Sequence, residues 1–260
     1  MKLRRLLDRR WLWPALVIAV AFALLVFFKP GPEGERVLVH SETFLFDVLL
    51  GGNRLGEEEV TYKEEAGAKT ARLTTASELT LPYGTLTVDS EADFSFPDLT
   101  LTRYRVTNTG EMCIADFTLL RQGDRFTFTT GGSEGGRTLE LPALPDTVLL
   151  DNNIAGHYQL LARRWKTMGE RMATFPVVVP QAGKVFEATL APGEERTGEL
   201  AGRRVVARGL RLAFGSLQAD LWVDGGTGDL LDVALHAKEE GEYRRVGFRW
   251  LSEGDASPPR

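Results

Sequence analysis

The sequence predicts a mainly β protein: a large curved antiparallel sheet or half-barrel, one amphipathic covering helix, and a single transmembrane helix before both. Three observations predict this class. An uncharged apolar run fills residues 11–28, and alternating apolar and polar residues recur over about 36–141 and 175–250. Between these two stretches, residues 151–168 have the periodicity of a helix. About 230 residues follow the apolar run, enough for one large β domain.

The apolar run, WLWPALVIAVAFALLVFF, has the length of a membrane span. Eighteen helical residues extend roughly 27 Å, close to the thickness of a bilayer's hydrocarbon core. Five Lys and Arg residues lie in the basic segment 1–10, whereas only Lys29 follows closely. This asymmetry predicts a single-pass protein of the inner (cytoplasmic) membrane, with the N-terminus in the cytoplasm and the main domain in the periplasm. A cleaved signal peptide is the alternative, although its apolar region is usually about 7–15 residues long.

Charge and cysteine content narrow the classes of partner. The whole chain has a net charge of −5, and residues 1–30 hold six basic residues and one acidic residue, which leaves −10 for the remainder. An acidic exported domain does not attract nucleic acid, so no nucleic-acid partner is expected. Cys113 is the only cysteine, which rules out an intramolecular disulfide, and its position in an apolar run favours burial as a small hydrophobic residue.

The exported part divides into three segments. Residues 29–35 (KPGPEGE) form a linker, residues 36–251 form the β-rich domain, and residues 252–260 form a polar tail that we expect to be disordered. Turn signals such as GGN, PYG, NTG and QGD separate the apolar-polar runs every 8–12 residues before the helix. This pattern predicts about eight strands before the helix and about six after it, joined as an antiparallel meander.

The helix over 151–168 is expected to lie across an open face or end of the sheet. Its apolar residues recur at spacings of four and three, which gives one apolar stripe: Ile154, Tyr158, Leu161, Trp165 and Met168. Asp151 or Asn152 is expected to cap the first turn, and Gly169 has the position of a left-handed C-terminal residue.

The clearest hairpin spans residues 217–235. Leu217, Ala219, Leu221 and Val223 are expected to share one face, and Leu231, Val233 and Leu235 to return on one face after the DGGTGD turn. Trp222 is expected to point to the opposite face.

Two of these segments carry a resemblance to a known family. FLFDVLLGGNRLGEEEVTYK (44–63) is an aromatic-rich strand, a glycine turn and a polar strand, and LQADLWVDGGTGDLLDVAL (217–235) is an apolar hairpin containing Trp222-x-Asp224. Together they resemble the bacterial envelope proteins grouped as domain of unknown function 3108, over roughly residues 40–250. The resemblance implies a secreted or periplasmic β-rich domain and no catalytic residues. The expected architecture is also similar to the half-barrel carriers of lipoproteins and lipopolysaccharide, although architecture alone does not set function.

Polar chemistry is sparse, and the sequence predicts no catalytic residue, no metal site and no cofactor. His40, His157 and His236 have no metal-ligand spacing. His157 is expected at the boundary of the helix stripe, bonded to the sheet or to water. His236 is expected to face Gln218 or Asp220 across the hairpin, either as a small acid–base cluster or as the wet side of a sheet. We therefore expect a protein that is not an enzyme.

Aromatic residues provide the one candidate binding site. Tyr158, Leu161 and Trp165 lie on the helix stripe, and Trp222 lies on the hairpin face opposite the main apolar face. If the helix covers that second face, these residues either fill a shared minor core or line an apolar groove for a lipid or acyl chain.

Two functions of different classes follow from these features. The first is a membrane-anchored envelope protein whose β domain binds a hydrophobic ligand, in transport or envelope assembly. The second is a non-catalytic module that binds other envelope proteins through an edge strand or an exposed helix face. A ligand carrier needs a continuous apolar cavity, whereas a module needs an exposed patch and a filled core.

Overall fold

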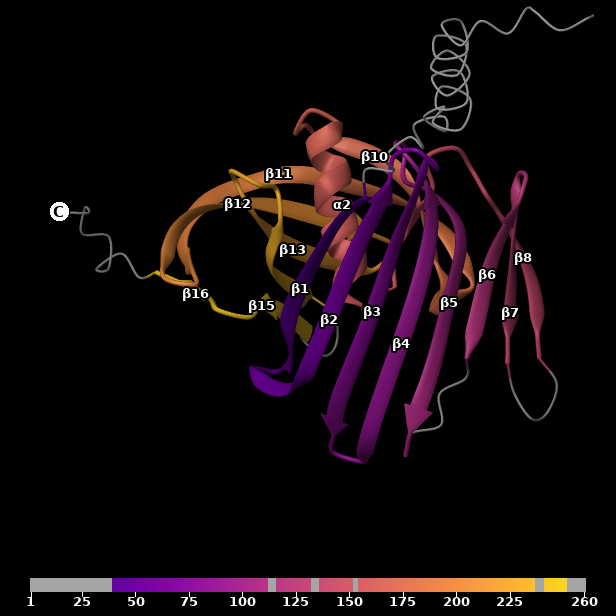
Figure 1. Cartoon of the computed structure of the whole chain (residues 1–260), viewed down its shortest axis with the longest axis horizontal. Coiled ribbons are helices and arrows are strands. Elements are labelled where there is room, and N and C mark those ends of the chain that lie inside the picture. The colour runs from indigo at the N-terminus through magenta and orange to yellow at the C-terminus, as the bar shows by residue number, and fades with distance from the viewer. Residues whose placement is uncertain (1–38, 112–115, 132–135, 152–153, 237–240, 252–260) are drawn as a thin grey trace, which may run out of the picture. The chain divides into compact units, whose positions relative to one another are not determined.

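The computed structural model describes residues 39–111, 116–131, 136–151, 154–236 and 241–251. Within these ranges the protein is mainly β, with sixteen strands in one large open sheet and one α-helix (Figure 1). The predicted membrane helix 11–28, the linker, the tail and Cys113 lie outside the described residues. No helix inside the described ranges is both long and apolar enough to cross a bilayer.

Nine strands precede the helix and seven follow it among the described residues, close to the eight and six that the sequence predicts. The first group is β1 (Val39–Leu50), β2 (Asn53–Glu65), β3 (Thr70–Leu81), β4 (Gly84–Ser95), β5 (Thr100–Gly110), β6 (Phe117–Gln122), β7 (Arg125–Thr130), β8 (Thr138–Pro142) and β9 (Val148–Leu149). The second group is β10 (Ala173–Val179), β11 (Lys184–Leu200), β12 (Arg203–Phe214), β13 (Leu217–Asp224), β14 (Leu230–His236), β15 (Gly241–Arg245) and β16 (Phe248–Trp250). A short 3₁₀ helix, η1 (Pro180–Ala182), joins β10 to β11.

Strand order follows chain order with a single jump. The sheet runs β8-β7-β6-β5-β4-β3-β2-β1-β15-β14-β13-β12-β11-β10-β9, and β16 pairs with the distal half of β11. Every pairing is antiparallel except that of β9 with β10. The pairing of β1 with β15 therefore joins the N-terminal and C-terminal meanders into one sheet. The predicted antiparallel meander is confirmed, as expected when sequential strands pair with each other.

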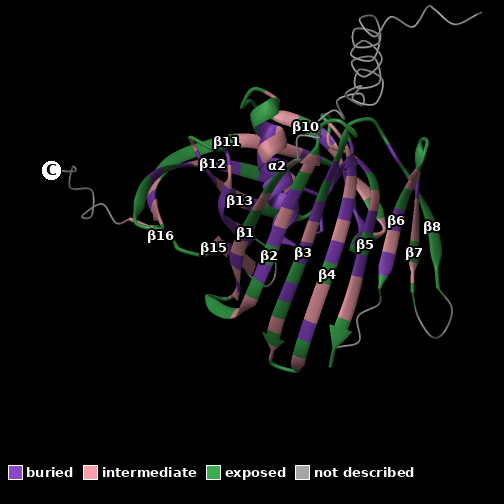
Figure 2. Ribbon diagram, in the orientation of Figure 1, coloured by how far each residue is buried: buried purple, intermediate pink, exposed green. Residues whose placement is uncertain are grey.

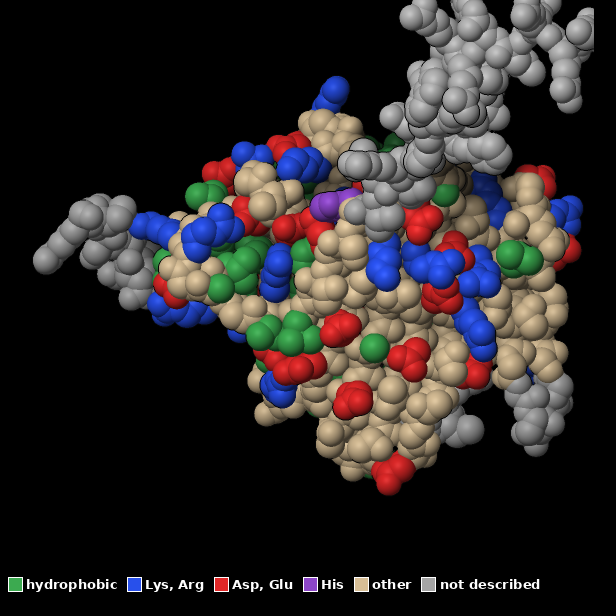
Figure 3. All heavy atoms as spheres, in the orientation of Figure 1, with side chains coloured by type: hydrophobic (Ala, Val, Ile, Leu, Met, Phe, Trp, Pro, Cys, Tyr) green, Lys and Arg blue, Asp and Glu red, His purple; other side chains and the backbone are tan. Residues whose placement is uncertain are grey.

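The alternation of residue types explains why these strands form. In β3, Ala71, Leu73, Thr75 and Ser77 are buried, and the residues between them are exposed or partly exposed. Side chains in a strand point alternately to the two faces, so this sequence gives one covered face and one wet face. Figure 2 shows the same banding along β2 to β5. On the wet face, Lys, Arg, Asp and Glu side chains are interspersed (Figure 3).

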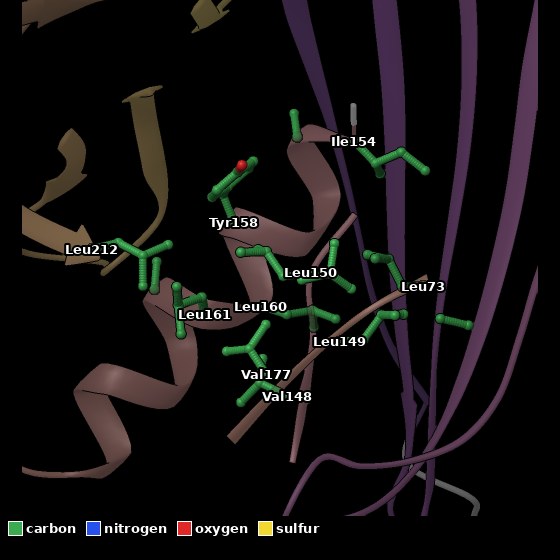
Figure 4. Close-up of a cluster of buried hydrophobic side chains, with 14 of the residues drawn as sticks. Leu73, Val148, Leu149, Leu150, Ile154, Tyr158, Leu160, Leu161, Val177 and Leu212 are labelled. Atoms are coloured by element: carbon green, nitrogen blue, oxygen red, sulfur yellow. The ribbon is translucent and has the colours of Figure 1, made fainter. Parts of the chain in front are cut away.

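The helix α2 (Ala155–Thr167) covers the middle of the sheet. It contacts β2, β3, β13 and β14, which flank the β1–β15 junction. Figure 4 shows Tyr158, Leu160 and Leu161 of the helix among side chains from the neighbouring strands. Every residue from Ala155 to Ala162 is buried, so the helix is packed on all sides over its first two turns. The buried surface of α2 is therefore wider than the single apolar stripe that the sequence predicts, because strands surround this part of the helix.

The start of α2 differs from the prediction in position and in cap. The helix begins at Ala155, four residues later than predicted, with Ile154 as its N-cap and no capping hydrogen bond from that residue's side chain. Asp151 does not cap the first turn; its carboxylate accepts a hydrogen bond from the Tyr104 hydroxyl instead. Asn152 lies outside the described residues. At the other end, Gly169 has a φ of +78°, which confirms the predicted left-handed residue.

Gly156 allows the helix to approach the sheet closely. A Cβ atom at this position would lie 2.9 Å from the Thr75 Cγ2 atom and 3.1 Å from the nearest methyl groups of Leu73 and Val60. Glycine is a poor helix former, so its presence one residue into α2 reflects this packing.

The two faces of the sheet carry separate apolar clusters. The larger cluster lies on the helix side and contains the predicted face of β13, including Ala219, Leu221 and Val223. The smaller cluster contains Val205, Ala207, Leu231 and Phe248. Leu231 was expected to share a face with Val233 and Leu235, and this prediction is wrong. The register between β13 and β14 shifts at Trp222/Val223, and this bulge turns Leu231 to the other face, so that Leu230 joins the main cluster.

Candidate functional site: an apolar pocket beside the helix N-terminus

A largely apolar pocket of about 480 Å³ opens beside the N-terminus of α2. We call it the leucine pocket, after the six leucines contributed by the β1–β2 and β3–β4 hairpins: Leu49, Leu50, Leu55, Leu79, Leu81 and Leu86. Its other apolar lining residues include Val88, Val106, Phe117, Ile154, Leu217, Leu235 and Tyr243. Its volume is within the range of about 300–1,000 Å³ that is typical of small-molecule sites. Two further hollows, of about 450 and 730 Å³, are lined mainly by threonine and charged residues.

The local sequence explains why this pocket is not filled. The leucines lie near the hairpin turns, where each strand extends past the part of the sheet that α2 covers. Leu49, Leu55 and Leu79 are only partly buried, although their side chains are large and apolar. Because α2 begins at Ala155, with Ile154 at the pocket wall, no helical side chain reaches these strand ends within the described residues.

Four polar residues line the leucine pocket: Asn108, Asp151, Gln181 and Glu242. Asp151 is almost fully buried, and its Oδ2 atom accepts a hydrogen bond of 2.8 Å from the Tyr104 hydroxyl. The carboxylate of Glu242 pairs with Arg244, two residues along β15, whereas Tyr243 between them is buried in the main cluster. The Glu242 carboxylate therefore lies on the opposite face from Tyr243, and Asp151 is the acid that faces the pocket.

Asp151 is part of a buried polar cluster that also includes Glu58, the residue that caps the N-terminus of α2. Glu58 on β2 is fully buried, and its two carboxyl oxygens accept hydrogen bonds of 3.0 and 3.1 Å from the backbone N–H groups of Ala155 and Gly156. Glu58 therefore satisfies two of the first-turn donors that the N-cap residue leaves unpaired. Burial raises the pKa of Glu58 from 4.5 to about 8; the two backbone hydrogen bonds oppose this rise, and the nearby Asp151 adds to it.

His157 belongs to the same cluster and is fully buried, not at the helix boundary where the sequence placed it. Its Nδ1 atom accepts a hydrogen bond of 2.9 Å from the Asp151 backbone N–H, so the neutral ring carries its proton on Nε2. Among the described residues, Nε2 has no hydrogen-bond partner. Burial lowers the pKa of His157 from 6.5 to about 3. His157 does not line the pocket, and its ring packs edge-on against that of Tyr104. A neutral imidazole that is inaccessible in this way has a structural role.

Three of the four predicted ligand-binding residues lie in the main cluster. Tyr158, Leu161 and Trp165 are almost fully buried, and the Trp165 indole N–H donates a hydrogen bond of 3.1 Å to the Arg171 carbonyl. None of the three lines the leucine pocket. Tyr158 comes nearest, because its ring packs against that of Tyr243, with 6.1 Å between the ring centroids. A ligand role for these residues stays a prediction.

The fourth predicted residue, Trp222, lies on the other face of the sheet and does not meet Trp165. It packs edge-on against Trp250, with 4.9 Å between the ring centroids, in the smaller cluster. The Arg196 guanidinium lies over both indole rings, at 4.4 Å from the centroid of Trp250 and 5.2 Å from that of Trp222. Trp250 also donates an indole hydrogen bond to Asp232. The four predicted residues therefore do not line one groove.

The remaining histidines pair with carboxylates at the surface. His236 lies opposite Gln218, and its Nε2 atom is 2.9 Å from Asp220 Oδ2, which confirms the predicted contact across the hairpin. His40 pairs with Glu42 in β1. Within the described ranges, no group of three or more His, Cys, Asp or Glu residues could hold a metal ion.

The fold and the pocket define a class: a mainly β domain with one open sheet, a covering helix and an apolar pocket at the end of that helix. No protein-family model matches the chain, and no curated protein matches it. The resemblance to the envelope family therefore stays a prediction.

Sequence reasoning did not find the leucine pocket, although a signal for it was present. Two hairpin turns are flanked closely by leucines, in LLGGNRL and LTLPYGTL. Large apolar residues beside exposed turns are not needed for the turns themselves, so their repetition in neighbouring hairpins indicates an apolar surface at one end of the sheet.

Proposed function

We propose that this chain is a membrane-anchored envelope protein that binds the hydrocarbon chain of a lipid in the leucine pocket. In this proposal residues 11–28 anchor the chain in the inner membrane, and the open sheet lies in the periplasm. The protein then transports or holds a lipid during envelope assembly. One observation supports this function above all: a pocket of about 480 Å³ whose lining is dominated by leucine and valine.

The mostly apolar lining of the pocket favours a hydrocarbon chain over a compact polar ligand. Each buried methylene contributes about 0.8 kcal/mol, and the apolar lining offers no comparable number of polar contacts. Affinity should therefore rise about fourfold for each added methylene and level off once the pocket is filled. A compact polar ligand would show no such dependence on chain length.

Photolabelling of the full chain in its own membrane tests this function. Cells are supplied with a lipid precursor that carries a diazirine in its acyl chain, and the labelled peptides are mapped after irradiation. We expect label on the two hairpins of the leucine pocket. Leu79→Trp places an indole in the pocket and should remove most of that label, whereas Val206→Trp, on an exposed β12 position, should leave it unchanged. Equal labelling of the two variants, or label spread evenly over the domain, would refute the proposal that the leucine pocket binds the hydrocarbon chain of a lipid.

A second function, binding of another envelope protein, is favoured by the edge strand β8. Within the described residues β8 is hydrogen-bonded to a strand on one side only. Leu139 in this strand is 44% exposed, and Leu144, just after it, is 47% exposed. An unpaired strand edge can accept an extended segment of another chain. A photoreactive amino acid at position 139 should then give a discrete cross-linked product in membranes, and the same amino acid at position 206 should not.

A further inference from the structure

The charges around the leucine pocket carry information about the head group of its ligand. Of the described lining residues, Asp151 and Glu242 are ionisable acids and none is Lys, Arg or His. The other polar side chains are the amides of Asn108 and Gln181. Sites for carboxylate or phosphate groups use arginine, lysine or a helix N-terminus. The described lining contains neither basic side chain.

The helix N-terminus beside the pocket is already occupied. Glu58 accepts the hydrogen bonds of the Ala155 and Gly156 N–H groups, which are the groups that would otherwise attract an anion. An incoming phosphate would have to displace this buried side chain and would also lie near Asp151. The N-terminus of α2 is therefore used within the fold and is not open to a negative head group.

Two arginines on strands that line the pocket, Arg244 on β15 and Arg54 on β2, are paired as well. Arg244 binds Glu242 and lies 3.5 Å from Asp232 on the opposite face of the sheet. At the hairpin end, Arg54 binds both Asp47 and Glu57. Each of these two arginines is thus matched by two carboxylates, so neither adds a net positive charge to the described surroundings of the pocket.

From this charge arrangement we infer that the leucine pocket selects single-chain lipids whose head group carries no negative charge, such as monoacylglycerols, and rejects their phosphorylated counterparts. This inference rests on the proposed function, because it takes the hydrocarbon chain to be the part that enters the pocket. The selection arises from repulsion by Asp151 and from the absence of a compensating cation in the described lining.

The test is a competition experiment on the full chain in phosphatidylcholine nanodiscs. A monoacylglycerol with a diazirine in its chain labels the protein, and two competitors are compared at equal mole fraction of the lipid. These are monolauroylglycerol and lauroyl lysophosphatidic acid, which differ only in one phosphate. We expect the phosphate-bearing competitor to be about tenfold weaker or more.

Two variants locate the origin of the selection. Asp151→Asn removes the acid that faces the pocket and should bring the two competitors closer together. Because Asp151 also binds Tyr104, a gain-of-function variant gives a second test. Asn108→Lys places a cation in the lining and should favour the phosphate-bearing competitor, whereas Thr107→Lys, on the other face of β5, should leave the preference unchanged.

The possible outcomes distinguish failure of the head-group selection from failure of the proposed function, lipid binding in the leucine pocket. If the probe labels no residue of the leucine pocket, the proposed function itself fails. If the pocket is labelled and lysophosphatidic acid competes as well as monolauroylglycerol, the pocket does bind the hydrocarbon chain of a lipid, but the proposed selection by head group is refuted. If Asn108→Lys and Thr107→Lys shift the preference equally, the selection does not arise in the pocket.

Discussion

The stability of this domain should depend on pH through two buried groups that act in opposite directions, Glu58 and His157. Both are fully buried in the cluster at the N-terminus of α2. Folding raises the pKa of Glu58 from 4.5 to about 8 and lowers that of His157 from 6.5 to about 3. Each shift makes the free energy of unfolding depend on pH over its own window.

The signs follow from which state binds more protons. Between pH 4.5 and about 8 the folded state keeps the Glu58 proton that the unfolded state has released, so stability falls as pH rises. Between about pH 3 and 6.5 the unfolded state protonates His157 whereas the folded state does not, so stability falls as pH drops. Where the windows overlap, from 4.5 to 6.5, the two contributions cancel.

The expected magnitudes are large enough to measure. At 1.36 kcal/mol per pKa unit, the Glu58 contribution falls by about 2 kcal/mol between pH 6 and 8. The His157 contribution falls by about 2 kcal/mol between pH 6.5 and 4.5. Glu58→Gln should remove the first dependence. His157→Asn, which keeps an acceptor for the Asp151 N–H, should remove the second.

Pulse proteolysis in urea measures the free energy of unfolding on the full chain, and the difference between wild type and each variant cancels the contributions of other titrating groups. We expect the difference for Glu58→Gln to change between pH 6 and 8, and that for His157→Asn to change between pH 4.5 and 6.5. Differences that stay constant with pH in both variants would contradict the burial of these two groups.

Two further predictions concern packing. Gly156→Ala should destabilise the domain by about 1–2 kcal/mol, because the clash of the new methyl group with Thr75 outweighs the gain in helix propensity. Adding Thr75→Ser, which removes the clashing methyl, should recover much of this loss, and an additive double mutant in urea denaturation would refute the contact. Trp250→Phe should cost about 1–3 kcal/mol, because Asp232 stays buried without its indole donor. Burial raises the pKa of Asp232 to about 6, so its side chain is ionised at pH 8 and largely protonated at pH 5. The loss of unfolding free energy in this variant should therefore be larger at pH 8 than at pH 5, and an equal loss at both pH values would contradict this prediction.

Much of the fold could be predicted because its signals are local. Strand positions follow from alternation, and most of the sheet order follows from the pairing of consecutive strands. The pairing of β1 with β15 joins distant segments and does not follow from that rule. The left-handed Gly169, the apolar face of β13 and the contact between His236 and Asp220 each depend on residues close in the sequence or across one hairpin.

The parts that sequence reasoning missed depend on contacts between distant segments. Glu58 caps a helix that begins 97 residues later, so the cap cannot be recognised beside the helix. Glu58 does share its strand face with Val60 and Tyr62, and this placement among apolar residues was the signal for its burial. The apolar stripe of the helix alone places His157 at its boundary, whereas in the structure strands cover the helix from several directions.

Whether the leucine pocket holds the hydrocarbon chain of a lipid can be tested by native mass spectrometry of the full-length protein, released from a detergent that is too bulky to enter the pocket. We expect a reproducible added mass in the range of a single-chain lipid on the wild-type protein and on Val206→Trp. This mass should be lost after organic extraction and be absent from Leu79→Trp. A wild-type protein at its bare mass, or the same added mass on Leu79→Trp, would show that the pocket does not hold a lipid chain.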